Sequence, residues 1–138
     1  QTGLRFFTVY GPWGRPDMAM YIFCRAIADG KPIPVFNNGD MMRDFTFIDD
    51  IVTGVVASLD NPVAIEEGAV PHRVYNIGNH RSEGKKAEID FQPMQPGDVK
   101  ASFADIDAIR RDLGFEPTTP IDVGIPKFVT WFKEYEKI

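Results

Sequence analysis

Residues 4–10 form a short, mostly apolar run of aromatic and β-branched side chains, and Gly11 and Pro12 end it. Polar and apolar positions do not alternate along this run, which is typical of a strand buried on both faces in a parallel sheet. Such a strand cannot stand alone, because its edges and faces need neighbours. Few other segments could flank it, so this run constrains the fold more than any other feature of the sequence.

Strand-like and helix-like segments alternate along the rest of the chain, which predicts the α/β class. Further strands are expected at residues 35–36, 43–48, 73–78 and 87–91. Helices are expected to begin at Pro16-Asp17, Asp49-Asp50, Asp105 and Thr119-Pro120, where N-terminal helix signals precede apolar residues at helical spacing. Gly30 and Gly114 are expected to end the first and the third of these helices.

The spacing of apolar residues also predicts which face of each helix is buried. In the second helix, the residues expected to face the core are Ile51, Val55, Val56 and Leu59, with Asp49 or Asp50 as the cap. In the last helix they are Ile125, Phe128, Val129 and Phe132. Cys24 lies on the apolar face of the first helix and is expected to be an inert core thiol.

The length and charge of the chain exclude several classes of function. At 138 residues the chain fits one domain with a real core. The net charge of -5 disfavours nucleic acid and anionic membranes as partners, although a local pocket could still bind an anionic small molecule. A single cysteine and the lack of a long apolar run indicate a soluble cytoplasmic protein. His72 and His80 lack partners at metal-ligand spacing, so no metal site is expected.

Four segments carry a resemblance to a known family. They read FFTVYGPWGRPDMA at residues 6–19, RDFTFIDDI at 43–51, YNIGN at 75–79 and MQPGDV at 94–99. In this order they resemble the extended short-chain dehydrogenase/reductase family of NAD-dependent epimerases and dehydratases, over essentially the whole chain. The first segment resembles most closely the UDP-glucuronate 4-epimerases.

The resemblance implies that residues 1–138 are the nucleotide-sugar-binding C-terminal region of a Rossmann-type NAD-binding fold. The family's glycine-rich pyrophosphate loop and its catalytic Tyr-x-x-x-Lys pair are not in this sequence. We therefore expect that the N-terminal dinucleotide-binding half is absent, that no catalytic residue lies in this chain, and that the chain by itself is inactive. The direct join of Glu83 to Gly84 also predicts a missing helix there, because a parallel crossover needs about a dozen residues or more.

The activity that the resemblance implies is NAD-dependent isomerisation of UDP-glucuronate to UDP-galacturonate, for capsular or cell-wall polysaccharide. In this family NAD takes a hydride from C4 of the sugar and returns it to the other face, while the protein orients both ligands. The full-length enzyme can be expected to form a homodimer. Alternatives are a UDP-glucose-type epimerase, a nucleotide-sugar 4,6-dehydratase, or an inactive nucleotide-sugar-binding fragment.

Three candidate residues lie in or near the first strand. Arg15 is expected to bind the sugar carboxylate, because a guanidinium matches a carboxylate bidentately, although it could also be an exposed arginine after a turn. Thr8 aligns with a residue that touches the same carboxylate, or it is simply a β-branched strand residue. Phe6 aligns with a position lining the nicotinamide pocket, and would be the cofactor contact of this chain; the alternative is a core aromatic.

The remaining candidates are expected to hold the UDP part of the substrate. Arg43 matches the arginine that pairs with the diphosphate. The alternative without a role in binding is a surface ion pair with Asp44. Val35 and Phe36 match the segment that covers the uracil, and Asp98 the carboxylate that accepts from the ribose hydroxyls. Gln95 stands where many relatives carry an arginine, which leaves one diphosphate contact unassigned.

Overall fold

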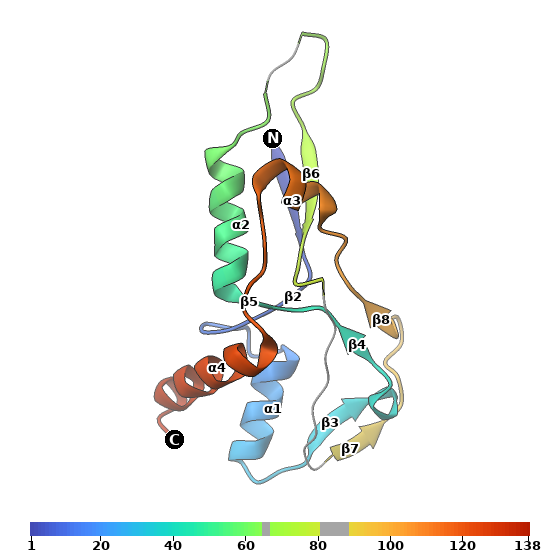
Figure 1. Ribbon diagram of the computed structural model, residues 1–138. Helices are drawn as coiled ribbons and strands as arrows, with labels where there is room; N and C mark the ends of the chain where they lie inside the picture. The colour runs from blue at the N-terminus through green and yellow to red at the C-terminus, as the bar shows by residue number, and fades with distance from the viewer. Residues whose placement is uncertain (65–66, 81–88) are drawn as a thin grey trace.

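The computed structural model describes residues 1–64, 67–80 and 89–138 and has the α/β class predicted from the sequence (Figure 1). Its strands are β1 (Thr2–Phe6), β2 (Thr8–Tyr10), β3 (Ile33–Phe36), β4 (Met42–Arg43), β5 (Phe45–Phe47), β6 (Arg73–Ile77), β7 (Ile89–Gln92) and β8 (Ala101–Ser102). Its helices are α1 (Ala19–Ala28), the short 3-10 turn η1 (Asn37–Gly39), α2 (Ile48–Asp60), α3 (Asp107–Leu113) and α4 (Ile121–Glu136). The expected gap at Glu83 and Gly84 lies outside the described residues.

The described strands form parallel pairs, β1 with β6, β2 with β5, β3 with β7 and β4 with β8. The strand predicted at residues 4–10 is divided at Phe7, where the chain changes partner. The amide of Phe7 donates to the carbonyl of Ile77 in β6, and the amide of Thr8 donates to the carbonyl of Asp44, next to β5. The prediction of parallel pairing is therefore confirmed.

The prediction that this first strand is buried on both faces is wrong for the described part of the chain. Phe6, at the end of β1, keeps 53% of its surface exposed. β1 has a hydrogen-bonded neighbour on one edge, β6, and β2 likewise has only β5. The described residues therefore cover one side of the first strand, and leave the ring of Phe6 on the surface.

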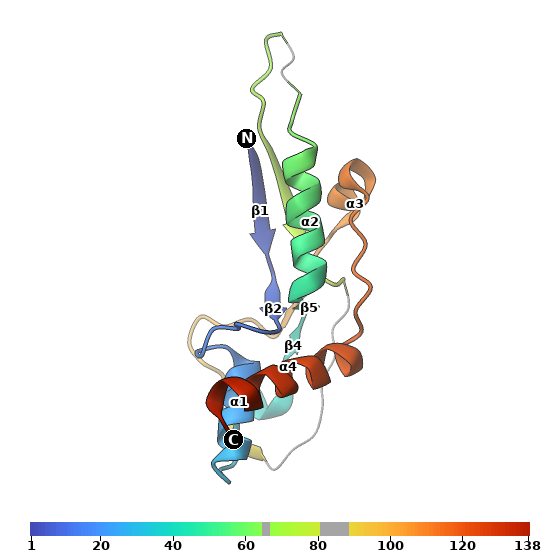
Figure 2. The same ribbon diagram turned by 90° about the vertical axis from the view of Figure 1, so that its left-hand side faces the viewer.

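Figures 1 and 2 show an elongated molecule with two packed regions along its length. In the upper region α2 and α3 lie beside β1 and β6, around a core that includes Ile51, Ile77, Ile106, Ile109 and Phe115. In the lower region α1 and α4 lie side by side next to β2 and β5, around Tyr10, Phe47 and Ile121. The second region positions the loop between β2 and α1, which is where the candidate site lies.

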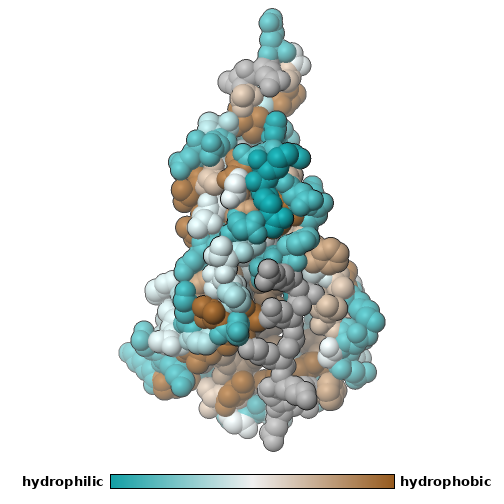
Figure 3. Space-filling view, in the orientation of Figure 1, coloured by the Kyte–Doolittle hydropathy of each residue, from teal (hydrophilic) through white to brown (hydrophobic). Residues whose placement is uncertain are grey.

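The buried face of α2 differs from the predicted one. Val55, Val56 and Leu59 are exposed, Leu59 by 77%, and apolar surface is visible along the α2 edge in Figure 3. Ile51 is buried as predicted, and the other buried residues of the helix are Asp50, Gly54 and Ser58. An added Cβ at Gly54 would lie 2.4 Å from Ile77 Cδ1 and 2.8 Å from Phe115 Cδ2. The helix thus packs so closely on the core that only small side chains fit at the contact.

The capping prediction for α2 is also wrong. The N-cap is Phe47, which makes no side-chain cap bond, and Asp49 is exposed. The buried carboxylate of Asp50 accepts hydrogen bonds from Thr119 N (2.9 Å) and Thr118 Oγ1 (3.3 Å). Asp50 therefore holds the segment that leads into α4 rather than the start of its own helix.

The remaining helix predictions are largely confirmed. Gly30 and Gly114 follow their helices with φ of +65° and +66°, as C-terminal stops require. Phe128 and Phe132 of α4 are buried. However, α1 begins at Ala19 rather than at Pro16 and Asp17, because the backbone of Met18 is extended, with φ of -89° and ψ of 148°.

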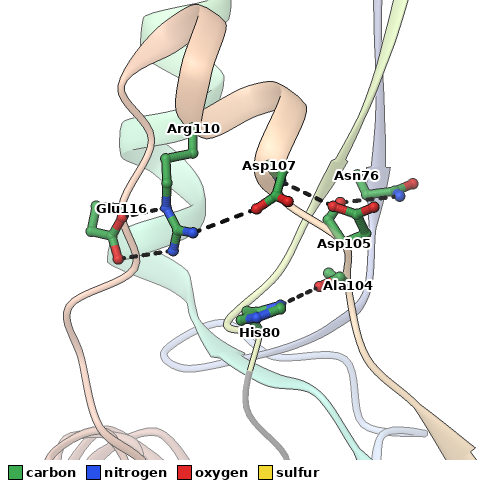
Figure 4. A network of polar contacts seen from close by, with 7 residues as sticks. All are labelled: Asn76, His80, Ala104, Asp105, Asp107, Arg110 and Glu116. Carbon is green, nitrogen blue, oxygen red and sulfur yellow. Dashed lines mark hydrogen bonds and ion pairs between the residues drawn. The ribbon is translucent and has the colours of Figure 1, made fainter.

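A polar network joins α3 to β6 and to the segment before α4 (Figure 4). Arg110 donates to both carboxylate oxygens of Glu116 (2.6 and 3.1 Å) and lies 3.7 Å from Asp107. At the start of α3 the amide of Asp107 donates to Asp105 Oδ1 (3.1 Å) and Asn76 Nδ2 donates to the carbonyl of Asp105 (3.2 Å). These contacts keep α3 against the strand that pairs with β1.

Asp44 joins the two regions of the fold. Its side chain has no exposed surface, and its Oδ1 accepts from Asn79 N (2.6 Å) and Thr46 Oγ1 (3.1 Å). Its Oδ2 accepts from His80 N (3.0 Å) and Ala104 N (2.8 Å). A carboxylate that accepts several backbone amides in this way connects β5, the turn after β6 and the segment before α3.

We predict that Asp44→Asn lowers the free energy of unfolding of the full-length protein by about 2–4 kcal/mol. The new amide nitrogen would face donors whichever way it turns, so two buried N–H or O–H groups would lose their acceptor. Chemical denaturation measures the loss. Asp40→Asn is the matched control, because Asp40 pairs with Lys100 on the surface, and its change should stay within about 0.5 kcal/mol. Equal effects of the two substitutions would contradict the structural role of Asp44.

Candidate functional site

A cavity of about 400 Å³ opens where β1 and β2 end. Its walls include Phe6, Val9, Trp13, Arg15, Met18 and Ile48. The carboxyl ends of parallel strands are the usual position of ligands in α/β folds, because the loops that follow the strands are free to shape a site there. The lining is mainly apolar, with the cation Arg15 at its edge, which suits an organic ligand that carries an anionic group.

The loop between β2 and α1 carries Arg15. Its side chain is 73% exposed, and it binds the carboxylate of Asp17 through Nε to Oδ1 (3.0 Å) and Nη2 to Oδ2 (2.5 Å). The hydrogen bond to Asp17 raises the pKa of Arg15, and the hydrogen bond from Arg15 lowers the pKa of Asp17. The structure thus shows the guanidinium holding a carboxylate in the bidentate arrangement that the sequence analysis expects for a substrate.

Phe6 and Thr8 lie on either side of the point where the chain changes partner. Phe6 lines the cavity and is half-exposed among the described residues, not buried in a core. Thr8 begins β2, is half-buried and is not among the residues that line the cavity. Its backbone is fixed by the hydrogen bond to Asp44.

The two residues expected to hold the diphosphate and the ribose pair with each other. Arg43 Nη2 lies 2.6 Å from Asp98 Oδ1, and both side chains are partly buried, with 20% and 32% exposed. The alternative of a surface ion pair between Arg43 and Asp44 is wrong, because Asp44 is buried and bound to other donors. Neighbouring residues of a strand point to opposite faces, which explains why these two do not meet.

Val35 and Phe36 lie in β3, whose parallel partner is β7. The chain continues from β7 into the segment that ends at Asp98, where Asp98 N donates to the carbonyl of Gln95 (3.2 Å). Strands β3, β4 and β7 lie together at the lower right of Figure 1, and β4 carries Arg43, which binds Asp98. Phe6 and Arg15 form a separate group at the cavity, and Thr8 connects to Arg43 only through the backbone of Asp44.

Sequence reasoning missed two residues of this region. Asp44 was considered only as a surface partner for Arg43, although an acidic residue between the aromatic and β-branched positions of a strand is itself a signal of a buried polar contact. Trp13 lies inside the quoted segment at residues 6–19, yet no role was assigned to it. It lines the cavity and has a φ of +65°, which is unusual for a bulky residue.

A second cavity, of about 270 Å³, lies at the other end of β6, beside Tyr75 and Asp112. Hydrogen bonds from Arg111, Tyr75 and Arg73 lower the pKa of Asp112 and occupy its carboxylate. Among residues 1–64, 67–80 and 89–138, no three His, Cys, Asp or Glu side chains gather as a metal site would need. No helix in that same part of the chain is long and apolar enough to cross a bilayer.

Comparison with known proteins identifies the family. The model of the NAD dependent epimerase/dehydratase family matches residues 1–78, which is more than half of the chain. The chain belongs to this family. The match includes Phe6, Thr8, Arg15 and Arg43 among the candidate residues.

Several curated relatives match the chain nearly end to end. Protein CapI of Staphylococcus aureus is 43% identical over 99% of this chain and 48% of its own length. UDP-glucuronate 4-epimerase 1 of Arabidopsis thaliana is 43% identical over 97% of this chain and 37% of its own length. The chain therefore spans less than half the length of these relatives.

A solved structure has the same fold. UDP-glucuronic acid 4-epimerase from Bacillus cereus, in complex with UDP-glucuronic acid and NAD, superposes with a TM-score of 0.82 at 32% identity. The superposition covers 96% of this chain and 45% of that protein. The shared fold thus extends over 96% of this chain, beyond residue 78 where the family match ends.

We predict that Arg15→Gln raises the pKa of Asp17 toward its ordinary value. In the folded protein this pKa is lowered, so the ion pair stabilises the fold above the ordinary carboxyl range and loses that effect as the pH falls through the lowered pKa. A titration of Asp17 followed by NMR, in both proteins, measures the change. Asp112 is the control, because its lowered pKa depends on Arg111, Tyr75 and Arg73 and should not move. An unchanged Asp17 would show that Arg15 does not bind it.

Proposed function

We propose that this chain is the nucleotide-sugar-binding region of an NAD-dependent UDP-glucuronate 4-epimerase, an isomerase that serves capsular or cell-wall polysaccharide synthesis. The observation that carries the proposal is the bidentate contact of Arg15 with a carboxylate at the rim of the apolar cavity. The Asp17 carboxylate stands in for the C6 carboxylate of a uronic acid. Relatives named UDP-glucuronate 4-epimerase, and a solved structure that holds UDP-glucuronic acid, support the same substrate.

The other candidate residues would hold the UDP part. Arg43 would neutralise the diphosphate, because a doubly charged group in a partly buried position needs a cation. Asp98 would accept from the ribose hydroxyls, Val35 and Phe36 would cover the uracil, and Thr8 would assist Arg15 at the carboxylate. Since Arg43 and Asp98 already pair at 2.6 Å, ligand binding would share or replace that contact.

The residues present fit one part of NAD. The half-exposed ring of Phe6, in an apolar cavity wall, offers a flat face to a nicotinamide. When bound, NAD supplies the hydride acceptor and donor of the reaction. The residues of this chain would orient the sugar and neutralise its charge. Neither the glycine-rich pyrophosphate loop nor the Tyr-x-x-x-Lys pair occurs in its sequence.

Residues 1–138 would act as one substrate-binding region of a cytoplasmic enzyme, which can form a homodimer. A second candidate activity is epimerisation of a neutral nucleotide sugar such as UDP-glucose. Its support is also the Arg15–Asp17 pair, because a guanidinium already satisfied by the protein's own carboxylate needs none from the substrate. The two candidates make opposite predictions for Arg15.

We predict that Arg15→Gln in the full-length protein weakens binding of UDP-glucuronate by about 10-fold to 100-fold, as expected for a charged hydrogen-bonded contact. UDP-glucose has no carboxylate, so its dissociation constant should change less than about twofold. Such a change is small, because about 1.4 kcal/mol of binding free energy corresponds to tenfold in affinity. Calorimetric titration measures both dissociation constants, and product analysis measures epimerisation.

Arg110→Gln is the matched control, because it removes the same charge from α3, where Arg110 binds Glu116 (Figure 4) and does not line the cavity. It should leave both dissociation constants unchanged. Equal binding of UDP-glucuronate before and after Arg15→Gln would reject the uronate substrate and favour the neutral sugar.

A further inference from the structure

Trp13 occupies an unfavourable backbone conformation on the surface of the candidate site. Its φ is +65°, a region that bulky L-residues rarely adopt, and 78% of its surface is exposed. Burial in the core therefore does not hold it there. Its ring contacts two aromatic rings of α4, Trp131 at a centroid distance of 5.8 Å and Tyr135 at 5.7 Å. These ring contacts are the interactions that can compensate for the backbone strain.

The two α4 rings form a platform for Trp13. Trp131 and Tyr135 are one helical turn apart and stack with a centroid distance of 5.1 Å and an interplanar angle of 22°. Tyr135 is itself half-exposed, so little else in the fold depends on it. We call Trp13, Trp131 and Tyr135 the aromatic clamp.

The helix that carries this platform is firmly placed. An added Cβ at Gly124 would lie 2.0 Å from the hydroxyl of Tyr10, so α4 packs directly on β2. Phe132 meets the ring of Tyr21 edge-on at 5.0 Å, and Glu136 binds both Tyr21 and Arg25 of α1. The platform is thus a fixed reference for the loop that Trp13 belongs to.

The same loop presents Arg15, two residues after Trp13. Gly14 N donates to the carbonyl of Gly11 (3.0 Å), and an added Cβ at Gly14 would lie 3.5 Å from Phe128 of α4. The loop therefore rests on α4 through both Gly14 and Trp13. Trp13 and Arg15 belong to this loop and line the same cavity. We therefore expect a change in the position of the Trp13 ring to move the guanidinium of Arg15.

We propose that the aromatic clamp positions Arg15 for a carboxylate, which makes Trp13, Trp131 and Tyr135 determinants of selectivity for charged over neutral nucleotide sugars. This inference rests on the proposed function, in which Arg15 binds the uronate. Trp131 and Tyr135 act through Trp13 and the loop, because they are not among the residues that line the cavity. They are positioning residues.

The test is the binding of UDP-glucuronate and UDP-glucose to Tyr135→Leu in the full-length protein, by calorimetric titration. We expect the dissociation constant of UDP-glucuronate to rise about fivefold, the size of one aromatic pair, and that of UDP-glucose to stay unchanged. Tyr135→Phe, which keeps the ring, should restore the wild-type value. Val123→Ala, on an exposed position of α4, is the control for a change on the helix itself.

The double variant Arg15→Gln with Tyr135→Leu separates positioning from a general structural effect. If the clamp acts through Arg15, Tyr135→Leu has no further effect once Arg15 is gone. Equal weakening of both ligands, or a full effect that persists in the Arg15→Gln background, would overturn the proposal. The proposal would also be overturned if Tyr135→Leu left binding unchanged while Arg15→Gln alone weakened the binding of UDP-glucuronate. That outcome would leave the proposed function intact. No effect of Arg15→Gln would reject both.

Discussion

The buried carboxylate of Asp44 is the interaction on which the rest of the structure depends. It carries a charge in a position without exposed surface, which is tolerable only because four donors surround it. Those donors come from β5, the turn after β6 and the segment before α3, so one side chain fixes three distant parts of the chain. Gly78 has to be a glycine there, since an added Cβ would lie 2.9 Å from Asp44 Oδ2. Arg43 precedes Asp44 in the chain and the amide of Thr8 donates to the backbone carbonyl of Asp44, so two of the candidate residues adjoin it.

The sequence predicted the strands and the C-terminal ends of helices well, and the helix starts and buried helix faces less well. Strand identity at residues 73–78 and the glycine stop at Gly114 depend on local preferences, which the chain expresses wherever it folds. The buried face of α2 depends on how closely the helix approaches Ile77 and Phe115. Hydrophobicity predicts that the valines of this helix are buried, whereas the buried residues include Gly54 and Ser58. The partner of Arg43 was missed for a similar reason. Asp98 lies 55 residues further along the chain, and only the fold brings it there.

The candidate site was predicted as a set of residues but not as an arrangement. The candidate residues could be predicted because motif spacing can be read directly from the sequence. The structure places two of them, Phe6 and Arg15, at one cavity. The contacts that hold Arg15 in place could not be read in the same way. Trp13 meets its partners more than 115 residues later in the chain, at Trp131 and Tyr135, and ring contacts of this kind leave no local pattern.

The parallel pairing of the strands has a consequence for how the chain folds. Thr2 pairs with Arg73 and Thr8 with Phe45, so no described strand pair can form by a tight hairpin. Long loops must close before any sheet hydrogen bond is made, and such topologies fold slowly. During synthesis β1 would leave the ribosome well before β6. The set of hydrogen bonds to Asp44 would remain incomplete until Ala104 had been made. Until β5 and β6 have been made, the apolar first strand has no partner from this region, and an unpaired apolar strand is prone to aggregation during that interval.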